Sequence, residues 1–273
     1  MTAPVEEVLD CGGSEISVLR GGSGDPVLVL HDELGWPGWT SWCEQLAEQR
    51  ELVVPLQPGF GRSPRIRWIR SYRDLALFYR RLVRELGLEP IDVIGFSAGG
   101  YIAAEMAASS PHSVGRVVLV APMGLKPKEG VIADFLAMPV GQHLAHTMAI
   151  ADAPDAAEIY GGPMSAEQFE LFEEARAETA RLGWEPFMFD PTLSHHLEGA
   201  AGELAVQLVW GDRDEIVPEQ CIDAYRAAIP GARVEIIEGA GHRPETELPE
   251  RFVSVVEQFL ATSHDGERQA QAA

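Results

Sequence analysis

The sequence is poor in cysteine and in positive charge. Its 273 residues include three cysteines, Cys11, Cys43 and Cys221, which lie far apart and form no Cys-x-x-Cys pair. A disulfide scaffold or a zinc site is therefore not expected, and a reducing cytoplasm fits this cysteine usage. Acidic residues outnumber basic ones by 42 to 21, and the net charge of −21 repels phosphate backbones and anionic lipids. We therefore expect neither nucleic acid nor a membrane as a partner.

Segments that are typical of export or membrane insertion are also missing. The first seven residues show no basic stretch followed by an apolar one, so we expect no signal peptide. Uninterrupted apolar runs of about 18 residues do not occur, so we expect no transmembrane helix. Apolar residues nevertheless make up 46% of the chain, enough to bury the core of one sizeable domain, for which we expect a cytoplasmic location.

Strand-like and helix-like patterns alternate along most of the chain. Short alternating stretches at residues 5–10 and 14–20 predict an antiparallel hairpin. Continuous apolar runs, typical of strands covered on both faces, follow at 27–30, 52–56, 91–94, 117–121, 204–210 and 234–237. Helical patterns separate most of these runs. The alternation predicts an α/β fold with a mostly parallel, doubly covered sheet of about eight strands.

This alternation stops between residues 122 and 200, where we find no strand-like run. We interpret residues 122–200 as a helical cap that covers the mouth of a pocket. The cap interrupts a core formed by residues 1–121 and 201–262. The polar residues 263–273 are expected to form a disordered tail.

Two helices are expected inside the cap. One spans residues 131–150 and is interrupted at Pro139. The other begins at the capping box Ser165-Ala166-Glu167-Gln168 and places Phe169, Phe172 and Leu182 on one side.

A serine stands at the tip of a glycine-rich turn, Gly95-Phe96-Ser97-Ala98-Gly99. The turn follows a buried strand pattern and precedes a run of small residues that predicts a helix. Strand, tight turn and helix are the context of a Gly-x-Ser-x-Gly nucleophile elbow, in which glycines allow the strand and helix to approach. Ser97 is therefore our candidate nucleophile.

A serine hydroxyl needs a neighbouring base, and the base needs a carboxylate that orients it. Candidate acids, Asp212 and Asp214, follow the strand that ends at Trp210, and the candidate base His242 follows the last strand. Both loops come after the carboxyl ends of predicted sheet strands, where open α/β sheets place their sites. The order serine, acid, histidine is that of a nucleophile elbow enzyme.

Over residues 5–262 the chain resembles an α/β-hydrolase fold enzyme. The motifs are the elbow, Gly211-Asp212-Arg213-Asp214, Gly239-Ala240-Gly241-His242 and Pro58-Gly59-Phe60-Gly61-Arg62-Ser63. The resemblance implies Ser97 as nucleophile, His242 as base and Asp214, rather than Asp212, as the orienting acid. No cofactor is implied.

The resemblance also implies an oxyanion hole formed by the backbone N–H groups of Ala98 and Glu33. Relatives usually carry His-Gly where this chain has His31-Asp32. The replacement puts the loop conformation in question and places carboxylates near the pocket. We hypothesise that Glu33 lines the active site and disfavours anionic acyl groups.

Aromatic and histidine side chains supply candidates for the substrate pocket: His31, Trp36, Phe96, His146, Trp184 and Phe187. Aromatic residues of this kind serve equally well as core. Histidines also occur at His143 and at 195–196, but no His-Glu-x-x-His pattern is present and we expect no metal.

We interpret the chain as a cofactor-free serine hydrolase, monomeric or homodimeric. Its expected reaction is hydrolysis of a carboxylic ester or lactone of a small, largely apolar substrate, through an acyl-enzyme. One alternative is hydrolysis of a carbon–carbon bond in a vinylogous diketone, as in ring-cleavage product hydrolases that share this fold. A second alternative, of another class, is a ligand-binding protein with a vestigial triad.

Overall fold

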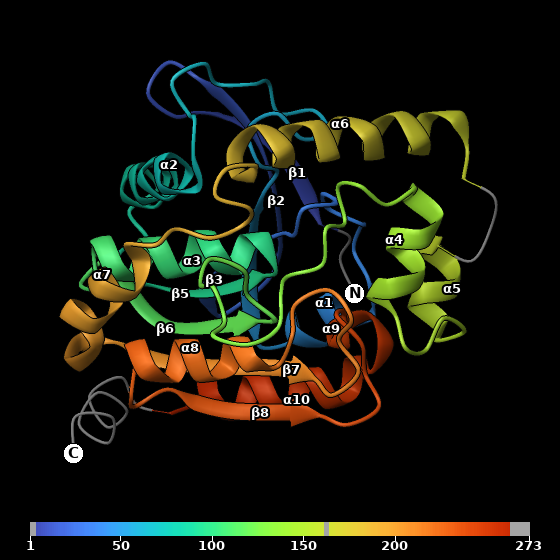
Figure 1. Ribbon diagram of the computed structural model, residues 1–273. Helices are drawn as coiled ribbons and strands as arrows, with labels where there is room; N and C mark the ends of the chain where they lie inside the picture. Colours follow the sequence, from blue (N-terminus) through green and yellow to red (C-terminus); the bar gives the residue numbers. More distant parts are fainter. Residues whose placement is uncertain (1–3, 161–163, 263–273) are drawn as a thin grey trace.

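Eight strands form one sheet at the centre of the molecule (Figure 1). We describe a computed structural model that covers residues 4–160 and 164–262, so the tail predicted at 263–273 lies outside the described residues. The strand order is β1-β2-β4-β3-β5-β6-β7-β8. The strands are β1 (Val5–Asp10), β2 (Glu15–Gly22), β3 (Asp25–Leu30), β4 (Arg50–Pro55), β5 (Ile91–Phe96), β6 (Val114–Val120), β7 (Ala205–Gly211) and β8 (Arg233–Ile237).

The pairing of the strands confirms the predicted hairpin and the mostly parallel sheet. Strand β2 is antiparallel to both β1 and β4, and every other neighbouring pair is parallel. Four helices connect parallel strands: α1 (Ser41–Leu46), α2 (Tyr72–Glu85), α3 (Ala98–Ser109) and α8 (Gln220–Ala228). Two more, α9 (Pro244–Glu247) and α10 (Pro249–Leu260), follow the last strand.

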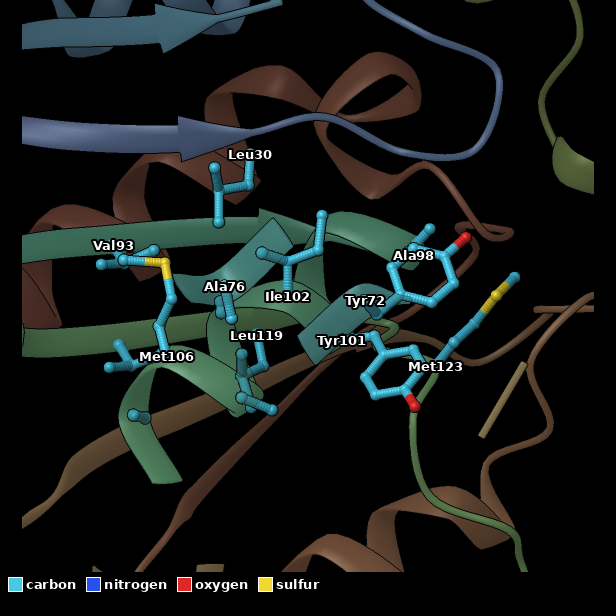
Figure 2. Close-up of a cluster of buried hydrophobic side chains, with 14 of the residues drawn as sticks. Leu30, Tyr72, Ala76, Val93, Ala98, Tyr101, Ile102, Met106, Leu119 and Met123 are labelled. Atoms are coloured by element: carbon cyan, nitrogen blue, oxygen red, sulfur yellow. The ribbon is translucent and has the colours of Figure 1, made fainter. Parts of the chain in front are cut away.

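Two buried clusters lie on opposite faces of the sheet because successive side chains of a strand point to opposite sides. In β5, Val93 belongs to one cluster with side chains from α2, α3 and α8. The next residue, Ile94, belongs to the other cluster with side chains from α1 and α10. This double covering explains why β5 is buried at every position and reads as a continuous apolar run. Figure 2 shows the first cluster where α3 packs on the sheet.

The segment between β6 and β7 is helical. It contains α4 (Val140–Thr147), α5 (Pro154–Tyr160), α6 (Ala166–Gly183) and α7 (Leu193–Ala200), followed by a 3₁₀ turn at Ala201–Glu203. Helix α6 begins at the predicted capping box, in which the side chains of Ser165 and Gln168 each bond the other's backbone N–H. Figure 1 shows α6 above the sheet, and α4 and α5 beside it.

Three details of this segment differ from the sequence predictions. The helix expected over 131–150 forms only from Val140, immediately after Pro139, because proline fits the start of a helix but not its interior. Phe169 is half exposed, while Phe172 and Leu182 are buried. Helix α7, which falls within the predicted cap, packs on α3 and α8 and so continues the helical layer over the sheet.

Helix α3 approaches the sheet so closely that its first turn tolerates no side chain. A Cβ atom added to Gly99 would lie 2.1 Å from the Leu30 carbonyl oxygen and 2.4 Å from that of His31. These are backbone atoms, which move only if the helix or the strand moves. Gly99 therefore sets the distance between α3 and the end of β3.

We predict that Gly99→Ala lowers the free energy of unfolding by about 3 kcal/mol or more, because overpacking against backbone forces α3 away from β3. Urea denaturation followed by circular dichroism measures this. Gly199→Ala is the matched control, since nothing lies within 4 Å of its added Cβ. Equal stability of both variants would contradict the assigned role of Gly99.

Candidate active site

Ser97 lies in a strained turn between β5 and α3. Its backbone has φ 51° and ψ −111°, outside the usual regions for a non-glycine residue. Neighbouring backbone holds it there: the Ser97 N–H donates to the Val120 carbonyl at 2.9 Å, and its carbonyl accepts from the Met123 N–H at 3.1 Å. The turn requires small flanking residues, since a Cβ on Gly95 would lie 2.8 Å from the Gly100 Cα. This is the geometry of the predicted elbow.

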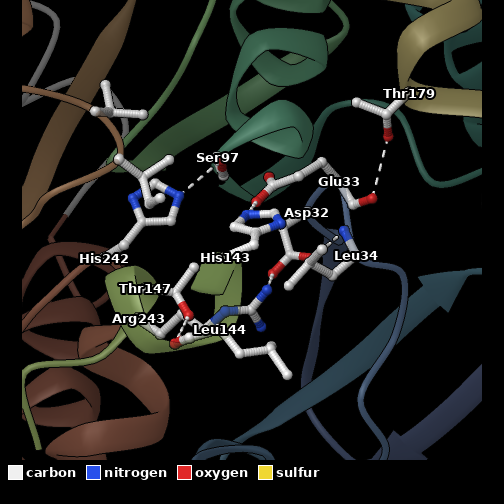
Figure 3. Close-up of polar contacts among 12 residues, drawn as sticks. Asp32, Glu33, Leu34, Ser97, His143, Leu144, Thr147, Thr179, His242 and Arg243 are labelled. Atoms are coloured by element: carbon white, nitrogen blue, oxygen red, sulfur yellow. Dashed lines mark hydrogen bonds and ion pairs between the residues drawn. The ribbon is translucent and has the colours of Figure 1, made fainter. Parts of the chain in front are cut away.

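The structure brings three predicted side chains into one chain of hydrogen bonds. His242 Nε2 lies 2.8 Å from Ser97 Oγ, and His242 Nδ1 lies 2.7 Å from Asp214 Oδ2 (Figure 3). The His242 and Asp214 side chains are both 1% exposed. Asp214 Oδ1 also accepts from the Ile216 and Val217 N–H groups at 2.8 and 2.9 Å. A buried carboxylate thus orients the imidazole, and the imidazole contacts the serine.

The other candidate acid has a different role in the structure. Asp212 is exposed, and its carboxylate accepts from the Gly239 N–H at 2.6 Å. This bond joins the loop after β7 to the loop after β8. Asp212 therefore helps to position the loop that carries His242, whereas Asp214 contacts the ring.

The loop that carries His242 is tied to the segment after α4. The Glu247 carboxylate accepts from the Gly241 N–H at 2.8 Å, and from the Ala149 and Ile150 N–H groups at 2.9 and 2.7 Å. The His242 N–H itself donates to the Thr147 carbonyl at 2.9 Å. Glu247 is buried, so it satisfies three backbone donors that water does not reach.

The unusual aspartate in the loop after β3 has a buried partner. Asp32 Oδ2 lies 2.5 Å from Nη2 of Arg243, the residue after His242, and Asp32 Oδ1 accepts from the Leu34 N–H at 2.8 Å. Burial raises the pKa of Asp32 to about 6, and the charge of Arg243 opposes that rise. The ion pair connects the predicted oxyanion loop to the histidine loop, which a glycine at position 32 would not do.

Glu33 is buried beside a histidine from α4. His143 Nε2 lies 3.6 Å from Glu33 Oε1, and neither side chain is exposed. Burial alone would raise the pKa of Glu33, but contact with His143 and the charges of His242 and Arg243 hold it below its ordinary value. The Thr179 hydroxyl of α6 donates to the Glu33 carbonyl at 3.1 Å. Figure 3 shows the Glu33 carboxylate directed toward Ser97.

The candidate base, His242, is surrounded by charge of both signs. Burial lowers the pKa of His242, but the charge and hydrogen bond of Asp214, together with the charge of Glu33, raise it to about 9. The charge of Arg243 opposes this rise in the pKa of His242. The neighbouring His143 behaves differently, because its burial lowers its pKa. Glu33 thus influences the base without touching it.

The residues predicted for a substrate pocket do not come together as one group. His31 and Trp36 line a pocket of about 410 Å³ together with Phe60 and residues of α6. Burial lowers the pKa of His31 to about 4, and its Nε2 accepts from the Gln57 N–H at 3.0 Å. Phe187 is partly buried against the Phe135 ring.

Three of those residues lie in other surroundings. Phe96 packs between Trp42 and Phe252 in the core cluster of α1 and α10, because its position in β5 points it to that face. Trp184 is 61% exposed. His146 is partly exposed and its Nδ1 lies 2.5 Å from Glu215 Oε2.

Sequence reasoning selected His146 from the cap, whereas the structure places His143 beside Glu33. Helical spacing in the sequence could have indicated this choice. Val140, His143 and Thr147, at intervals of three and four, form the buried face of α4, and His146 lies outside that face. Arg243 was also missed as the partner of Asp32. Its burial depends on an ion pair across the fold, which no local pattern indicates.

Within residues 4–160 and 164–262, three or more histidine, cysteine, aspartate or glutamate side chains do not gather at a site that could hold a metal ion. The same described part of the chain contains no helix with the length and apolar character needed to cross a membrane.

Comparison with known proteins agrees with this architecture. A family model described as "Alpha/beta hydrolase family" matches residues 27–255. An uncharacterised protein of Mycobacterium tuberculosis is 26% identical over 270 residues, covering 90% of this chain and 78% of the relative. A 2-hydroxymuconate semialdehyde hydrolase of Pseudomonas sp. is 27% identical over 258 residues, covering 88% of each chain. The naproxen esterase of Bacillus subtilis superposes with a TM-score of 0.73 at 17% identity, covering 94% of this chain and 91% of the esterase.

Because the family model spans most of the chain, this protein belongs to the α/β hydrolase family. The esterase comparison, at its low identity, shows the shared fold alone. The similar proteins include both a 2-hydroxymuconate semialdehyde hydrolase and an esterase, which act on different substrates. Family membership therefore indicates a hydrolase without identifying its substrate.

We predict that Glu247→Gln lowers the free energy of unfolding by about 1–3 kcal/mol. The three backbone N–H groups now donate to two carboxylate oxygens, whereas the amide of glutamine has a single acceptor oxygen. The loosened loop should also reduce kcat more than it raises KM on any substrate that the protein hydrolyses. Urea denaturation and steady-state kinetics measure the two effects. Glu250→Gln, an exposed position on α10, should change neither; a variant at 247 that behaves like this control would contradict the role of Glu247.

Proposed function

We propose that the protein is a serine hydrolase that cleaves a carboxylic ester or lactone of a small, largely apolar substrate through an acyl-enzyme. The observation that carries the proposal is the continuous contact from Ser97 Oγ through the His242 ring to the Asp214 carboxylate. This arrangement turns a weakly nucleophilic hydroxyl into one whose proton has an acceptor within hydrogen-bonding distance.

In the proposed reaction, Ser97 Oγ attacks the ester carbonyl carbon and its proton passes to His242 Nε2. The carbon–oxygen bond to the leaving group then breaks, and His242 returns the proton to the departing alkoxide. Water next attacks the acyl-enzyme while His242 accepts its proton, and His242 returns that proton to Ser97 Oγ as the acyl carbon–oxygen bond breaks and the carboxylic acid leaves. Asp214 keeps the imidazole oriented and stabilises its charged form throughout.

The tetrahedral intermediates of both steps need hydrogen-bond donors for the carbonyl oxygen. We propose that the Ala98 N–H, at the start of α3, and the Glu33 N–H supply them. The close approach of Gly99 to the Leu30 and His31 carbonyls supports this, since it keeps the loop after β3 next to the elbow. A helix N-terminus also favours developing negative charge.

A carbon–carbon hydrolase is the second candidate, because a named relative is a 2-hydroxymuconate semialdehyde hydrolase. Muconate-type substrates carry a carboxylate. The buried Glu33 would repel such a group near Ser97, so the ester reaction is better supported. A binding protein with a vestigial triad is the candidate of another class, which the unbroken hydrogen-bond chain disfavours. A small-molecule substrate, the absence of nucleic-acid and membrane partners, a monomeric or homodimeric state and a cytoplasmic location remain predictions.

We predict that a fluorophosphonate probe adds once to the wild-type protein and not to Ser97→Ala, because only an oxygen beside its base displaces the leaving group of the probe. Intact-mass spectrometry of both proteins measures the adduct. A folded wild-type protein that remains unlabelled would contradict the serine mechanism and favour the binding protein.

We predict that kcat/KM for an ester rises with pH through a midpoint near pH 9 and levels off above it, because His242 must lose its proton before it accepts one from Ser97. Glu33→Gln removes a negative charge that favours protonated His242, so the midpoint should move toward lower pH. The measurement is a pH–rate profile for both proteins. Glu250→Gln, on the surface of α10, should leave the midpoint unchanged, and a profile for Glu33→Gln identical to wild type would contradict the coupling.

A further inference from the structure

Glu33 and His143 carry polar atoms for which the described residues supply no hydrogen-bond partner. Both carboxylate oxygens of Glu33 and both ring nitrogens of His143 are buried in this state. The 3.6 Å between His143 Nε2 and Glu33 Oε1 is longer than a hydrogen bond. Buried polar groups are costly without partners, and the proposed chemistry of Ser97, His242 and Asp214 does not use these two side chains. They therefore require an explanation of their own.

Aromatic rings flank the histidine of this pair. The His143 ring stacks on Phe135 with centroids 4.9 Å apart, and the edge of Phe172 lies 6.2 Å from it. Thr179 holds the Glu33 backbone through its carbonyl. An imidazole flanked by aromatic rings thus lies beside a carboxylate whose backbone is held by α6, and apolar rings with a few polar groups are typical of a small-molecule binding site.

The position of the pair relative to Ser97 indicates which part of a substrate it meets. In Figure 3, His242 and Glu33 approach Ser97 from opposite sides. The leaving group of an ester departs on the side of His242, because His242 returns the proton to it. The acyl group therefore extends toward Glu33 and His143.

We infer that Glu33 and His143 form a subsite that binds a hydrogen-bond donor on the acyl group of the substrate, either a hydroxyl or an ammonium. This inference rests on the proposed serine hydrolase function. A hydroxyl donates to the Glu33 carboxylate and accepts from a His143 N–H, so it satisfies both residues. An ammonium satisfies Glu33 by charge. A carboxylate in the same place meets like charge in a buried setting and is rejected.

Four ethyl esters with four-carbon acyl chains test the inference: ethyl butyrate, ethyl 3-hydroxybutyrate, ethyl 3-aminobutyrate and monoethyl succinate. Their leaving group is identical, and acid release in a pH-stat gives kcat/KM for each. We expect the wild-type protein to prefer the hydroxyl or the ammonium ester over ethyl butyrate by about 10-fold or more, the scale of a hydrogen bond to a buried charge. The preferred ester identifies the donor. Monoethyl succinate should be about 10-fold slower than ethyl butyrate or worse.

Two variants assign these preferences to the pair. In Glu33→Gln, where the negative charge is gone, kcat/KM for monoethyl succinate should lie within about 3-fold of that for ethyl butyrate. Any preference for the ammonium ester over ethyl butyrate should also fall to about 3-fold or less. His143→Phe should reduce a hydroxyl preference. Glu105→Gln is the matched control: it removes a buried carboxylate of α3 that pairs with Arg73, and it should leave all ratios unchanged.

Equal rates on all four esters, or wild-type ratios in a folded Glu33→Gln protein, would overturn the inference while leaving the serine mechanism intact. Binding of the same esters to Ser97→Ala, measured by calorimetry, separates the two proposals. Selective binding of the donor esters, combined with an unlabelled wild-type serine, would retain the subsite and refute the hydrolase. Binding without selectivity would refute the subsite.

Discussion

The close approach of α3 to the ends of β3 and β5 is the constraint on which the site depends. Three glycines permit it, because any side chain at Gly95, Gly99 or Gly100 would meet backbone or Pro122 at 2.8 Å or less. The approach forces Ser97 into its strained turn and holds the loop after β3 against the elbow. The end of β7 and the loop after β8 approach each other just as closely, since a Cβ added to Gly211 would lie 2.0 Å from the Gly241 carbonyl oxygen. Close packing of backbone thus brings together the loops that carry the candidate site residues.

Two buried pairs, Asp214 with His242 and Asp32 with Arg243, then hold the loops together, and Glu33 lies 3.6 Å from His143 without a hydrogen bond. Each pair joins segments distant in sequence, and burying one member alone would be costly. The pairs therefore favour a single relative placement of the loops after β3, β7 and β8. They also concentrate charge around the His242 ring, which links the proton affinity of the base to the residues that face a substrate.

The helical segment between β6 and β7 contributes side chains and backbone groups to the candidate site. Helix α4 supplies His143, and its last carbonyl accepts from the His242 N–H. Helix α6 supplies Thr179, and backbone N–H groups after α4 donate to Glu247. The same contacts that hold this segment on the core thus shape the space beside Ser97. Changes in the segment should alter substrate preference and the position of the base together.

Local patterns in the sequence determined the sheet, the hairpin, the capping box of α6 and the loops that carry Ser97, His242 and the two candidate acids, because strand periodicity, capping and turn residues act over a few neighbouring residues. The choice of Asp214 over Asp212 came from the family resemblance. The tertiary structure decided which side chains meet. It placed Phe96 in the core rather than a pocket, chose His143 over His146, and gave Asp32 a partner in Arg243. Those outcomes depend on the face that each element turns toward segments far away in the chain, and on the cost of burying a charge without a partner. Local sequence patterns indicate neither the orientation of an element toward distant segments nor the partner of a buried charge.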